Sequence, residues 1–313
     1  MSFAAMMLVA MALDAAIGWP SQLYAVIGHP VTWIGALIRW LDIRLNHDAA
    51  PDPARRIAGV ATALIVVGLT TAATCALQNL LPAGWLGILI GGILAWPFLA
   101  LRSMYTHVAA VVSPLQVNDL LKARFEVSMI VGRNTAVLDQ AGVARAAMES
   151  LAENTSDGIV APLFWGAIFG LPGIAAYKAI NTLDSMIGHR TPRFNAFGWA
   201  SARIDDLVNL IPARLTGLVF AAVSTAPSRA LQVMWRDAGL HRSPNAGWPE
   251  AAMAAGLGVR LSGPRVYEGH IADEPWVNAG APDPNAADLQ RGLALYLRAM
   301  FVLGAALLAL ALV

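Results

Sequence analysis

Residues 57–81 read IAGVATALIVVGLTTAATCALQNLL, and residues 84–101 read GWLGILIGGILAWPFLAL. Neither run contains a charged residue, and each is long enough to cross the hydrocarbon core of a bilayer as an α-helix. The Leu-Pro-Ala-Gly turn that joins them is short and uncharged, so we expect the two helices to form a hairpin. These segments predict an all-α membrane protein.

The composition of the chain agrees with a membrane location. Hydrophobic residues make up 57% of the 313 residues and charged residues 13%, about half the charged share of a soluble domain. The formal net charge is +1 and no basic run exceeds the pair Arg55-Arg56, so we expect no nucleic-acid partner. Only Lys122 and Lys178 are lysines, so most basic residues are arginines. The planar guanidinium group of arginine is well suited to bind carboxylate and phosphate.

Other segments also have membrane character. Residues 2–18, 207–226 and 293–313 are span candidates because they are long apolar runs. Residues 159–177 are apolar as well, but prolines and glycines interrupt them, so they should span in pieces or re-enter. We therefore expect a polytopic helical protein with five to six spanning or re-entrant helices, forming one integral membrane domain over residues 1–313.

Three polar excursions should leave the bilayer, at residues 102–157, 178–206 and 227–290. The first is rich in basic residues, so the positive-inside rule places it in the cytoplasm. Re-entry of residues 159–177 would keep the first two excursions on one face, whereas a full crossing would separate them. Residues 30–46 predict an interfacial amphipathic helix, and a short Ala-rich helix is expected near residues 249–257.

A first polar cluster lies in MESLAENTSDG, residues 148–158. A helix would place Glu149, Glu153 and Asp157 on one face, with Asn154 beside them, and a cation would relieve their repulsion. Magnesium is the natural candidate, because it accepts one or two carboxylates together with phosphates and waters. The alternative is a solvated helix face that ends in turn-forming residues.

A second cluster lies in YKAINTLDSMIG, residues 177–188, where helical spacing brings Lys178, Asn181 and Asp184 to roughly one side. A cation beside a carboxylate suits a nucleotide phosphate with its metal. The alternative is a self-neutralising pair at a helix end.

The third cluster is ARIDDLVNLIPARL, residues 202–215. Asn209 follows Asp205 and Asp206 by about one helical turn, between Arg203 and Arg214, and the string is similar to acidic motifs that hold magnesium diphosphate. An acidic first turn of a helix would look the same.

A fourth cluster, Gly132-Arg133-Asn134-Thr135, reads as a turn just before a helix that can bind an oxyanion. Thr135 is equally suited to be only a helix N-cap. No HExxH, CxxC, Walker A, GxGxxG or GxSxG pattern occurs in the chain.

Taken together, these strings resemble one family, the membrane-bound CobD/CbiB proteins of cobalamin biosynthesis, which are adenosylcobinamide-phosphate synthases. The resemblance covers most of the chain. Its departures are Trp19 and Asn134, where the family usually has Asp. It is carried by D-x3-G-x-P at 14–20, HPVTWIG at 29–35, VGRNT at 131–135, AMESLAENTSDGIVAPLFW at 147–165, AYKAINTLDSMIGHR at 176–190, FGWASARIDDLVNLIPARLTG at 197–217 and SPNAGWPEAAMAAGLGVRLSGPRVY at 243–267.

The resemblance implies an ATP-dependent amide ligation in the inner membrane, with the active site facing the cytoplasm. The free propionate of adenosylcobyric acid, a corrinoid, would be joined to 1-amino-2-propanol or its O-phosphate, with ATP and Mg²⁺ as cofactors. Other membrane proteins of cobalamin synthesis are expected as neighbours in the bilayer.

The resemblance and the clusters together give an expected role to each candidate residue. Glu149, Glu153 and Asp184 are expected to be catalytic. Asp157, Asp205 and Asp206 are expected to bind the metal. The expected substrate- and phosphate-binding residues are Arg133, Thr135, Asn154, Lys178, Asn181, Arg190, Arg203, Asn209, Arg214 and Asn245.

Three other functions compete with ligation at this stage. A transporter of a corrinoid or another small molecule would also have broken helices and intramembrane acids. A membrane phosphotransferase acting on lipid alcohols would explain the DDxxN string. A structural assembly partner would tolerate loss of Glu153 or Asp184.

Overall fold

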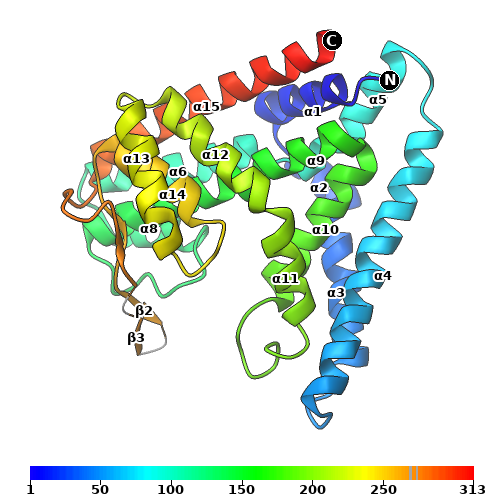
Figure 1. The fold of residues 1–313 in the computed structure, drawn as a ribbon, viewed down its shortest axis with the longest axis horizontal. Coiled ribbons are helices and arrows are strands. Elements are labelled where there is room, and N and C mark those ends of the chain that lie inside the picture. The colour runs from blue at the N-terminus through cyan, green and yellow to red at the C-terminus, as the bar shows by residue number, and fades with distance from the viewer. Residues whose placement is uncertain (268–269, 273) are drawn as a thin grey trace. The chain divides into compact units, whose positions relative to one another are not determined.

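The computed structural model describes residues 1–267, 270–272 and 274–313 (Figure 1). Positions 268, 269 and 273, inside the excursion predicted at 227–290, lie outside the described residues. The described chain is almost entirely helical, which confirms the all-α prediction. It divides into two compact units. Unit 1 comprises Met1–Ala100, Ala161–Asn209 and Ala306–Val313, and unit 2 comprises Leu101–Val160 and Leu210–Ala305.

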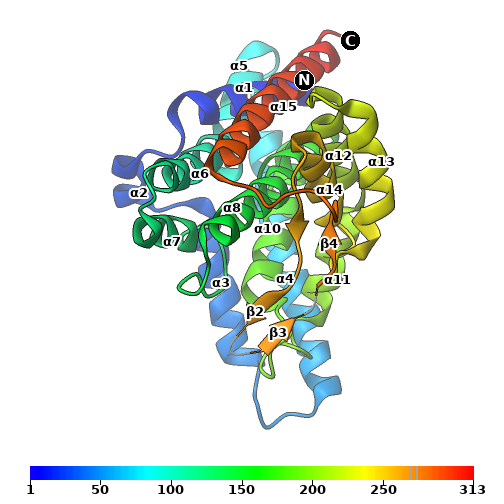
Figure 2. The same cartoon turned by 90° about the vertical axis from the view of Figure 1, so that its left-hand side faces the viewer.

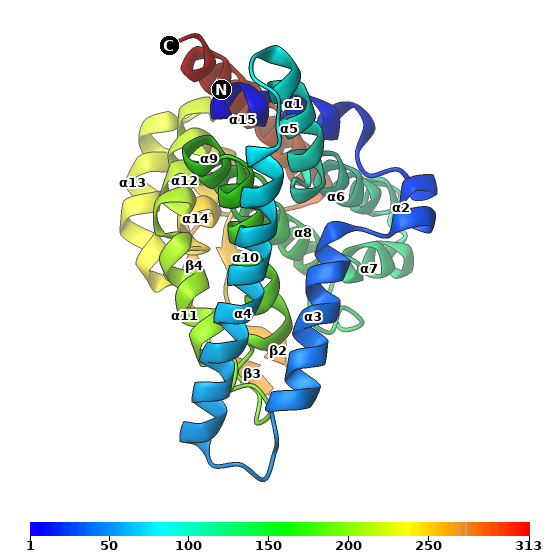
Figure 3. The ribbon, with the colours of Figure 1, turned by 90° about the vertical axis from the view of Figure 1, so that its right-hand side faces the viewer.

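Unit 1 is organised around a central helix, α10, that packs against α3, α4, α9 and α11. Figure 3 shows α3, α4 and α10 running side by side. The helices of this unit are α1 (Phe3–Ile17), α2 (Ser21–Ile27), α3 (Pro30–Leu45), α4 (Asp52–Asn79), α5 (Trp85–Ala95), the 3-10 turn η1 (Trp96–Phe98), α9 (Ala161–Phe169), α10 (Leu171–Ile187) and α11 (Trp199–Val208).

The interruptions predicted between residues 159 and 177 are present as a break between α9 and α10. Gly170 lies at the break with φ +70°, a conformation that L side chains rarely adopt. Gly173, in the first turn of α10, allows the Trp165 carbonyl to approach, because an added Cβ would lie 2.1 Å from that oxygen. Small residues therefore allow α9 and α10 to pack closely across the break.

Unit 2 packs helices around α14, which contacts α8, α12 and α13. Two short antiparallel pairs accompany them: β1 pairs with β4, and β2 with β3 (Figure 2). Unit 2 contains α6 (Leu101–Gln116), α7 (Leu120–Ser128), α8 (Gln140–Thr155), the π-helix η2 (Ser156–Val160), α12 (Leu210–Val223), α13 (Pro227–Asp237), the 3-10 turn η3 (Ala238–Leu240), α14 (Gly247–Leu257), β1 (Leu261–Ser262), β2 (Arg265–Tyr267), β3 (His270–Ala272), β4 (Trp276–Val277) and most of α15 (Ala286–Leu312).

Three described helical segments are long and apolar enough to cross a membrane: Asp52–Asn79, Trp85–Gln116 and Ala286–Leu312. Two bent pairs, Phe3–Ile17 with Ser21–Leu45 and Trp199–Val208 with Leu210–Val223, raise the number to five if each is one span. Five is the lower end of the predicted five to six. The protein is thus a polytopic helical membrane protein, and the first residues of the excursion predicted at 102–157 continue a span candidate.

Two local predictions can be compared directly with the fold. The Ala-rich helix expected near 249–257 is confirmed as α14. The helix start expected at Thr135 is wrong, because α8 begins at Gln140 and is capped by Asp139, whose side chain accepts from the Gly142 backbone N–H. Asp is preferred over Thr as an N-cap residue, and Asp139 directly precedes the helix. Thr135 therefore lies in the loop before α8. The single membrane domain over residues 1–313 stays a prediction.

Candidate functional site

The strongest polar cluster of unit 1 lies where α10 meets α11. From α10 it receives Lys178, Asn181 and Asp184, and the Lys178 Nζ lies 3.4 Å from the Asn181 Oδ1. From α11 it receives Asp205 and Asp206. The charge of Asp206 acts on Asp184 and on Asp205, and the charge of Asp184 acts on Asp205. The structure therefore brings the second and third predicted clusters together. We call these five residues the α10–α11 cluster.

Asp205 is held by a buried hydrogen-bond chain that sequence reasoning did not find. The Tyr177 hydroxyl donates to the Asn209 Oδ1 at 2.9 Å, and the Asn209 Nδ2 donates to the Asp205 Oδ2 at 3.0 Å. Asn209 is 1% exposed, and its amide fixes the carboxylate; substrate binding by Asn209 stays a prediction. No sequence pattern joins Tyr177 to Asn209, because the two residues are 32 positions apart.

The Asn181 side-chain amide also acts on the Asp205 carboxylate, but the other Asp205 oxygen, Oδ1, is buried and has no donor at normal hydrogen-bond geometry among the described residues. Buried carboxylate oxygens are normally hydrogen-bonded or bound to a metal, because desolvation of an unpaired charge is costly. Asp184 and Asp206 add like charge nearby. The arrangement therefore favours a cation at Asp205.

Basic side chains adjoin this carboxylate cluster on its more exposed side. The Arg203 Nη1 lies 3.5 Å from the Asp206 Oδ2, and the charge of Arg190 also acts on Asp206. Burial raises the pKa of Asp184, Asp206 raises it further, and the neighbouring His189 opposes the change. Asp184 therefore binds a proton more readily than an ordinary aspartate does.

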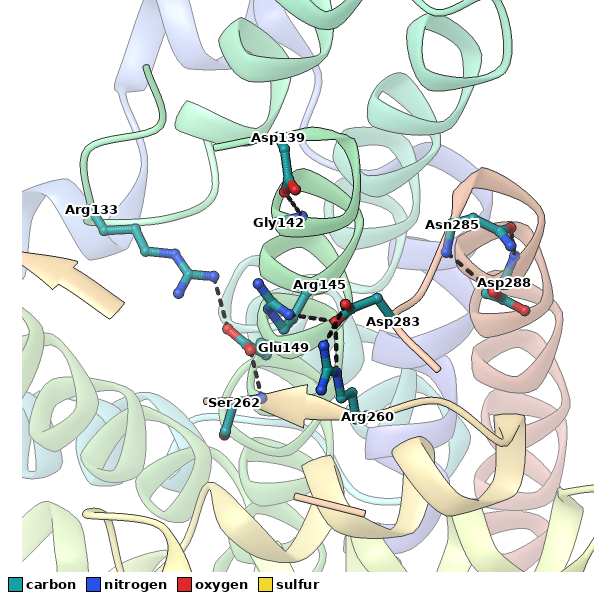
Figure 4. Close-up of polar contacts among 10 residues, drawn as sticks. All are labelled: Arg133, Asp139, Gly142, Arg145, Glu149, Arg260, Ser262, Asp283, Asn285 and Asp288. Atoms are coloured by element: carbon teal, nitrogen blue, oxygen red, sulfur yellow. Dashed lines mark hydrogen bonds and ion pairs between the residues drawn. The ribbon is translucent and has the colours of Figure 1, made fainter. Parts of the chain in front are cut away.

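Unit 2 contains a second polar cluster, shown in part in Figure 4. The Arg133 Nη2 lies 2.8 Å from the Glu149 Oε2, and the Ser262 backbone N–H donates to the Glu149 Oε1 at 2.8 Å. The Ser262 hydroxyl donates to the Glu250 Oε2 at 3.0 Å, and the His241 Nε2 lies 3.6 Å from the Glu250 Oε1. The pair Arg133–Glu149 joins two predicted residues, and both oxygens of Glu149 are engaged.

The carboxylate face predicted along α8 is not formed as expected. Glu149 is buried and neutralised by Arg133, whereas Glu153 is exposed. The helix passes into the π-helix η2 at Ser156, which shifts Asp157 from the regular spacing. Asn154 donates its Nδ2 to the Ser150 carbonyl of its own helix at 2.9 Å. The prediction of three acids at regular spacing on one helix face is therefore wrong, whereas the predicted roles of Glu153, Asn154 and Asp157, cation binding included, stay predictions.

Beside this cluster, Asp283 binds two arginines (Figure 4). The Arg260 Nη2 lies 2.6 Å from the Asp283 Oδ2, and the Arg145 Nη1 lies 2.7 Å from its Oδ1. Both guanidinium groups also lie over the Trp276 ring, at 4.0 Å and 4.7 Å from its centroid. The hydrogen bond from Arg260 and the charge of Arg145 outweigh burial and lower the pKa of Asp283.

The last two predicted residues of unit 2 are near each other. Arg214 lies over the Trp248 ring at 4.3 Å and donates its Nη1 to the Leu210 carbonyl at 2.7 Å. The Trp248 backbone N–H donates to the Asn245 carbonyl at 3.1 Å, and Asn245 is buried. Substrate binding by Arg214, Asn245 and Thr135 remains a prediction.

Sequence reasoning did not single out several members of these clusters. Glu250 carried a usable signal, because an acid inside an Ala-rich helix must find a partner when buried. Arg145, Ser262 and Asp283 carried none, since their partners are distant in sequence. Among the described residues no group of three or more His, Cys, Asp or Glu could by itself hold a metal ion.

The fold and the α10–α11 cluster define a polytopic helical membrane protein with a site of carboxylates, amides and basic residues. Its family is shown by comparison. The family model described as CobD/Cbib protein matches residues 7–296, so the chain belongs to the CobD/CbiB family.

Curated relatives agree over nearly the whole length. A protein of Rhodobacter capsulatus is 68% identical over 300 residues, covering 96% of this chain and 95% of the relative. A protein of Sinorhizobium sp is 45% identical, covering 97% of each chain, and one of Brucella suis biovar 1 is 44% identical, covering 97% and 96%. Each is named "Cobalamin biosynthesis protein CobD". No solved structure matches the chain.

Proposed function

We propose that this protein takes part in cobalamin biosynthesis as an ATP-dependent ligase. It would join the free propionate of adenosylcobyric acid to 1-amino-2-propanol or its O-phosphate, giving adenosylcobinamide or its phosphate. The names of the relatives support the pathway. The observation that supports the reaction class is the buried Asp205 Oδ1 in a group of acids that adjoins basic residues.

Magnesium fits this site in a limited way. No described set of three acids forms a cage, but Mg²⁺ usually needs only one or two carboxylates when phosphates and waters complete its shell. Asp205 and Asp206 would hold the ion, and when bound it would neutralise the phosphates of ATP. The hydrogen bond from Asn209 would keep the Asp205 carboxylate in a fixed orientation.

The basic side chains at the same site would bind the phosphates of ATP. Lys178 on α10 and Arg203 on α11 adjoin the carboxylates, and Arg190 adds a third cation from the loop between these helices. Guanidinium groups bind phosphate through two parallel hydrogen bonds. In this arrangement the acidic side chains would bind the metal and the basic side chains would bind the phosphates.

The chemistry follows from the need to activate a carboxylate. A propionate oxygen attacks the γ-phosphorus of ATP, and the bond between this phosphorus and the oxygen that bridges to the β-phosphate breaks. ADP departs, and the propionate has become an acyl phosphate. The neutral amine then attacks the acyl carbon, phosphate departs, and the amine proton passes to a base. Asp184 suits this last role, because burial raises its pKa, whereas both oxygens of Glu149 are already engaged.

A membrane location follows from the spans, and we propose the inner membrane with the site facing the cytoplasm, where ATP is present. The excursion over residues 102–157 carries the basic residues that support this orientation. Substrate and product are large and polar. Neighbouring membrane proteins of the same pathway would therefore be suitable partners for passing the product on.

The test is direct detection of the amide by mass spectrometry. Purified protein in detergent or nanodiscs is incubated with adenosylcobyric acid, Mg-ATP and either 1-amino-2-propanol or its O-phosphate. The proposal expects a product of the matching mass with at least one amine, one ADP per amide, and none when ATP or Mg²⁺ is omitted. The variant Asp205→Asn serves as the inactive control.

Absence of product with both amines, from folded protein, would contradict the ligase assignment. Uptake of labelled corrinoid into proteoliposomes would then support a transporter. Incorporation of a nucleotide-linked alcohol into lipid would support a phosphotransferase.

A further inference from the structure

The loop between α10 and α11, residues 188–198, carries two of the charged groups that face the α10–α11 cluster. The charge of His189 acts on Asp184, and the charge of Arg190 acts on Asp206. Both residues are exposed. The His189 ring also hydrogen-bonds the Ser185 carbonyl of α10 at 2.7 Å, so the loop matters most for the position of Arg190. The strongest anchor of the loop is Arg193.

Arg193 is bound from both its backbone and its side chain. Its carbonyl oxygen accepts hydrogen bonds from the Arg55 Nη2 and from the Asn46 Nδ2, the latter at 3.2 Å. Its own Nη2 donates to the Asp42 Oδ2 at 2.9 Å. The three partners come from the last turns of α3, the residue after it and the first turns of α4.

Arg55 is the buried centre of this arrangement. It is 7% exposed, and its Nε also donates to the Asn46 Oδ1 at 3.0 Å. Its neighbour Arg56 is exposed, and its guanidinium lies 5.8 Å from the Trp199 ring centroid. A charged side chain is rarely buried without partners. The partners of Arg55 are the Arg193 carbonyl, the Asn46 amide and, at 3.7 Å, the exposed Asp48 carboxylate.

Close backbone packing fixes the far end of the same loop. A Cβ on Gly59 of α4 would lie 1.8 Å from the Phe197 carbonyl oxygen, and a Cβ on Gly198 would lie 1.6 Å from the Ile187 carbonyl oxygen. The loop is therefore pressed against α4 at Phe197 and against the end of α10 at Gly198. Arg55 binds its middle.

We infer that Arg55 is a positioning residue that holds the 188–198 loop through the Arg193 carbonyl, so that Arg190 faces the α10–α11 cluster. This role adds a positioning residue to the proposed ligase site, and its effect on catalysis rests on that proposed function. Arg55 touches no reacting group. It acts by keeping Arg190 beside the phosphates that Asp206 and its metal would hold.

The inference is tested with Arg55→Met, which keeps the stem of the side chain and removes every donor. Arg56→Met is the matched control, because it removes the same charge from the next position without touching Arg193. Arg55→Lys retains the charge and one donor group, so it should give an intermediate result. The variants are purified as full chains and compared by hydrogen–deuterium exchange.

We expect the backbone amides of 188–198 to exchange about 10-fold faster in Arg55→Met, since the loop opens locally more often. Arg56→Met should match the wild type. Unchanged exchange in Arg55→Met, or equal acceleration in both variants, would overturn the inference. If Arg55→Met does not fold, Arg55→Lys gives the same comparison with a smaller amplitude.

The catalytic consequence is measured separately in the amide assay. The KM for Mg-ATP should rise by about 5- to 10-fold in Arg55→Met with kcat changed by less than about 2-fold, because a phosphate-binding group is displaced while the base stays. Faster exchange with an unchanged KM would overturn the positioning role. Inactivity of the wild type would instead remove the proposed ligase function, and the exchange data would still decide whether Arg55 holds the loop.

Discussion

The Asn209 amide donates to one oxygen of Asp205 and leaves the other, Oδ1, buried without a hydrogen bond from the described residues. Because the Tyr177 hydroxyl fixes Asn209 in turn, the amide cannot turn to serve both oxygens. An ionised carboxylate in this setting is costly unless a cation or a proton neutralises it. Such local cost is typical of a functional site.

Substitution of Asp205 by Asn should separate activity from stability. The amide retains the shape of the side chain and can still accept from Asn209, but it lacks the charge that would bind a metal. We expect amide formation to fall by at least about 100-fold, as when a principal electrostatic group is removed. The free energy of unfolding should be unchanged or higher by about 1 kcal/mol, because a buried acid near two like charges is removed. Product formation and thermal unfolding midpoints measure the two effects.

Asp52→Asn is the control for that experiment, because it neutralises an exposed acid at the start of α4. It should retain full activity. A fall in both activity and melting temperature in Asp205→Asn would indicate that Asp205 serves the fold, not a ligand.

The link from Asp283 to Arg260 and Arg145 should make stability depend on pH. The pKa of Asp283 is lowered in the folded protein, so the ionised carboxylate stabilises the fold at pH values above its unfolded pKa, about 4. This contribution is lost as the pH falls through the lower, folded pKa. Asp283→Asn should therefore destabilise the protein at pH 7, by about 1–2 kcal/mol since the carboxylate is partly exposed. The difference from the wild type should shrink as the pH falls below about 4.

Thermal unfolding of both proteins between pH 7 and pH 3 measures this dependence. Glu126→Gln, a half-buried acid on α7, should show no comparable change. A difference for Asp283→Asn that stays constant over the whole range would contradict the prediction.

Long apolar runs allowed the spans to be predicted, because a helix in lipid must be continuous and apolar over its length. α4 and α15 show this, since each lies in a run with few charges. The strands β1 and β4 could not be predicted in the same way. They are two residues long and pair across a long connection, so no alternating pattern develops.

The candidate site was predictable residue by residue but not in its connections. Lys178, Asn181, Asp184 and the Asp205-Asp206 pair were found because acids and amides near a bilayer are conspicuous. The bonds to Tyr177 and the pairing of Glu149 with Arg133 depend on how separate segments pack. The same holds for Arg55, whose partner is a backbone carbonyl that no side-chain pattern reveals.

Ser262 should be more sensitive to Ala than to Gly. Its backbone has φ +58°, a region that costs about 1 kcal/mol or more for residues with a Cβ. Both substitutions remove the hydroxyl that donates to Glu250, but only Gly relieves the backbone strain. We expect Ser262→Ala to lower the free energy of unfolding by about 1–3 kcal/mol and Ser262→Gly by about 1 kcal/mol less. Equal melting temperatures for the two variants would contradict this order.

Gly59 and Gly68 provide a matched pair within α4. A Cβ at position 59 would lie 1.8 Å from the Phe197 carbonyl oxygen, whereas a Cβ at position 68 meets nothing within 4 Å. Gly59→Ala must therefore displace α4 from the loop that carries Arg193, with a loss of several kcal/mol typical of severe overpacking. Gly68→Ala should be neutral or stabilising by up to about 1 kcal/mol, because Ala is the better helix former. The yield of monodisperse protein and its melting temperature measure both effects. If both alanine variants were equally stable, α4 would not pack against Phe197 as closely as the structure shows. The contact between Arg55 and the Arg193 carbonyl would then be the main contact that holds the 188–198 loop against α4.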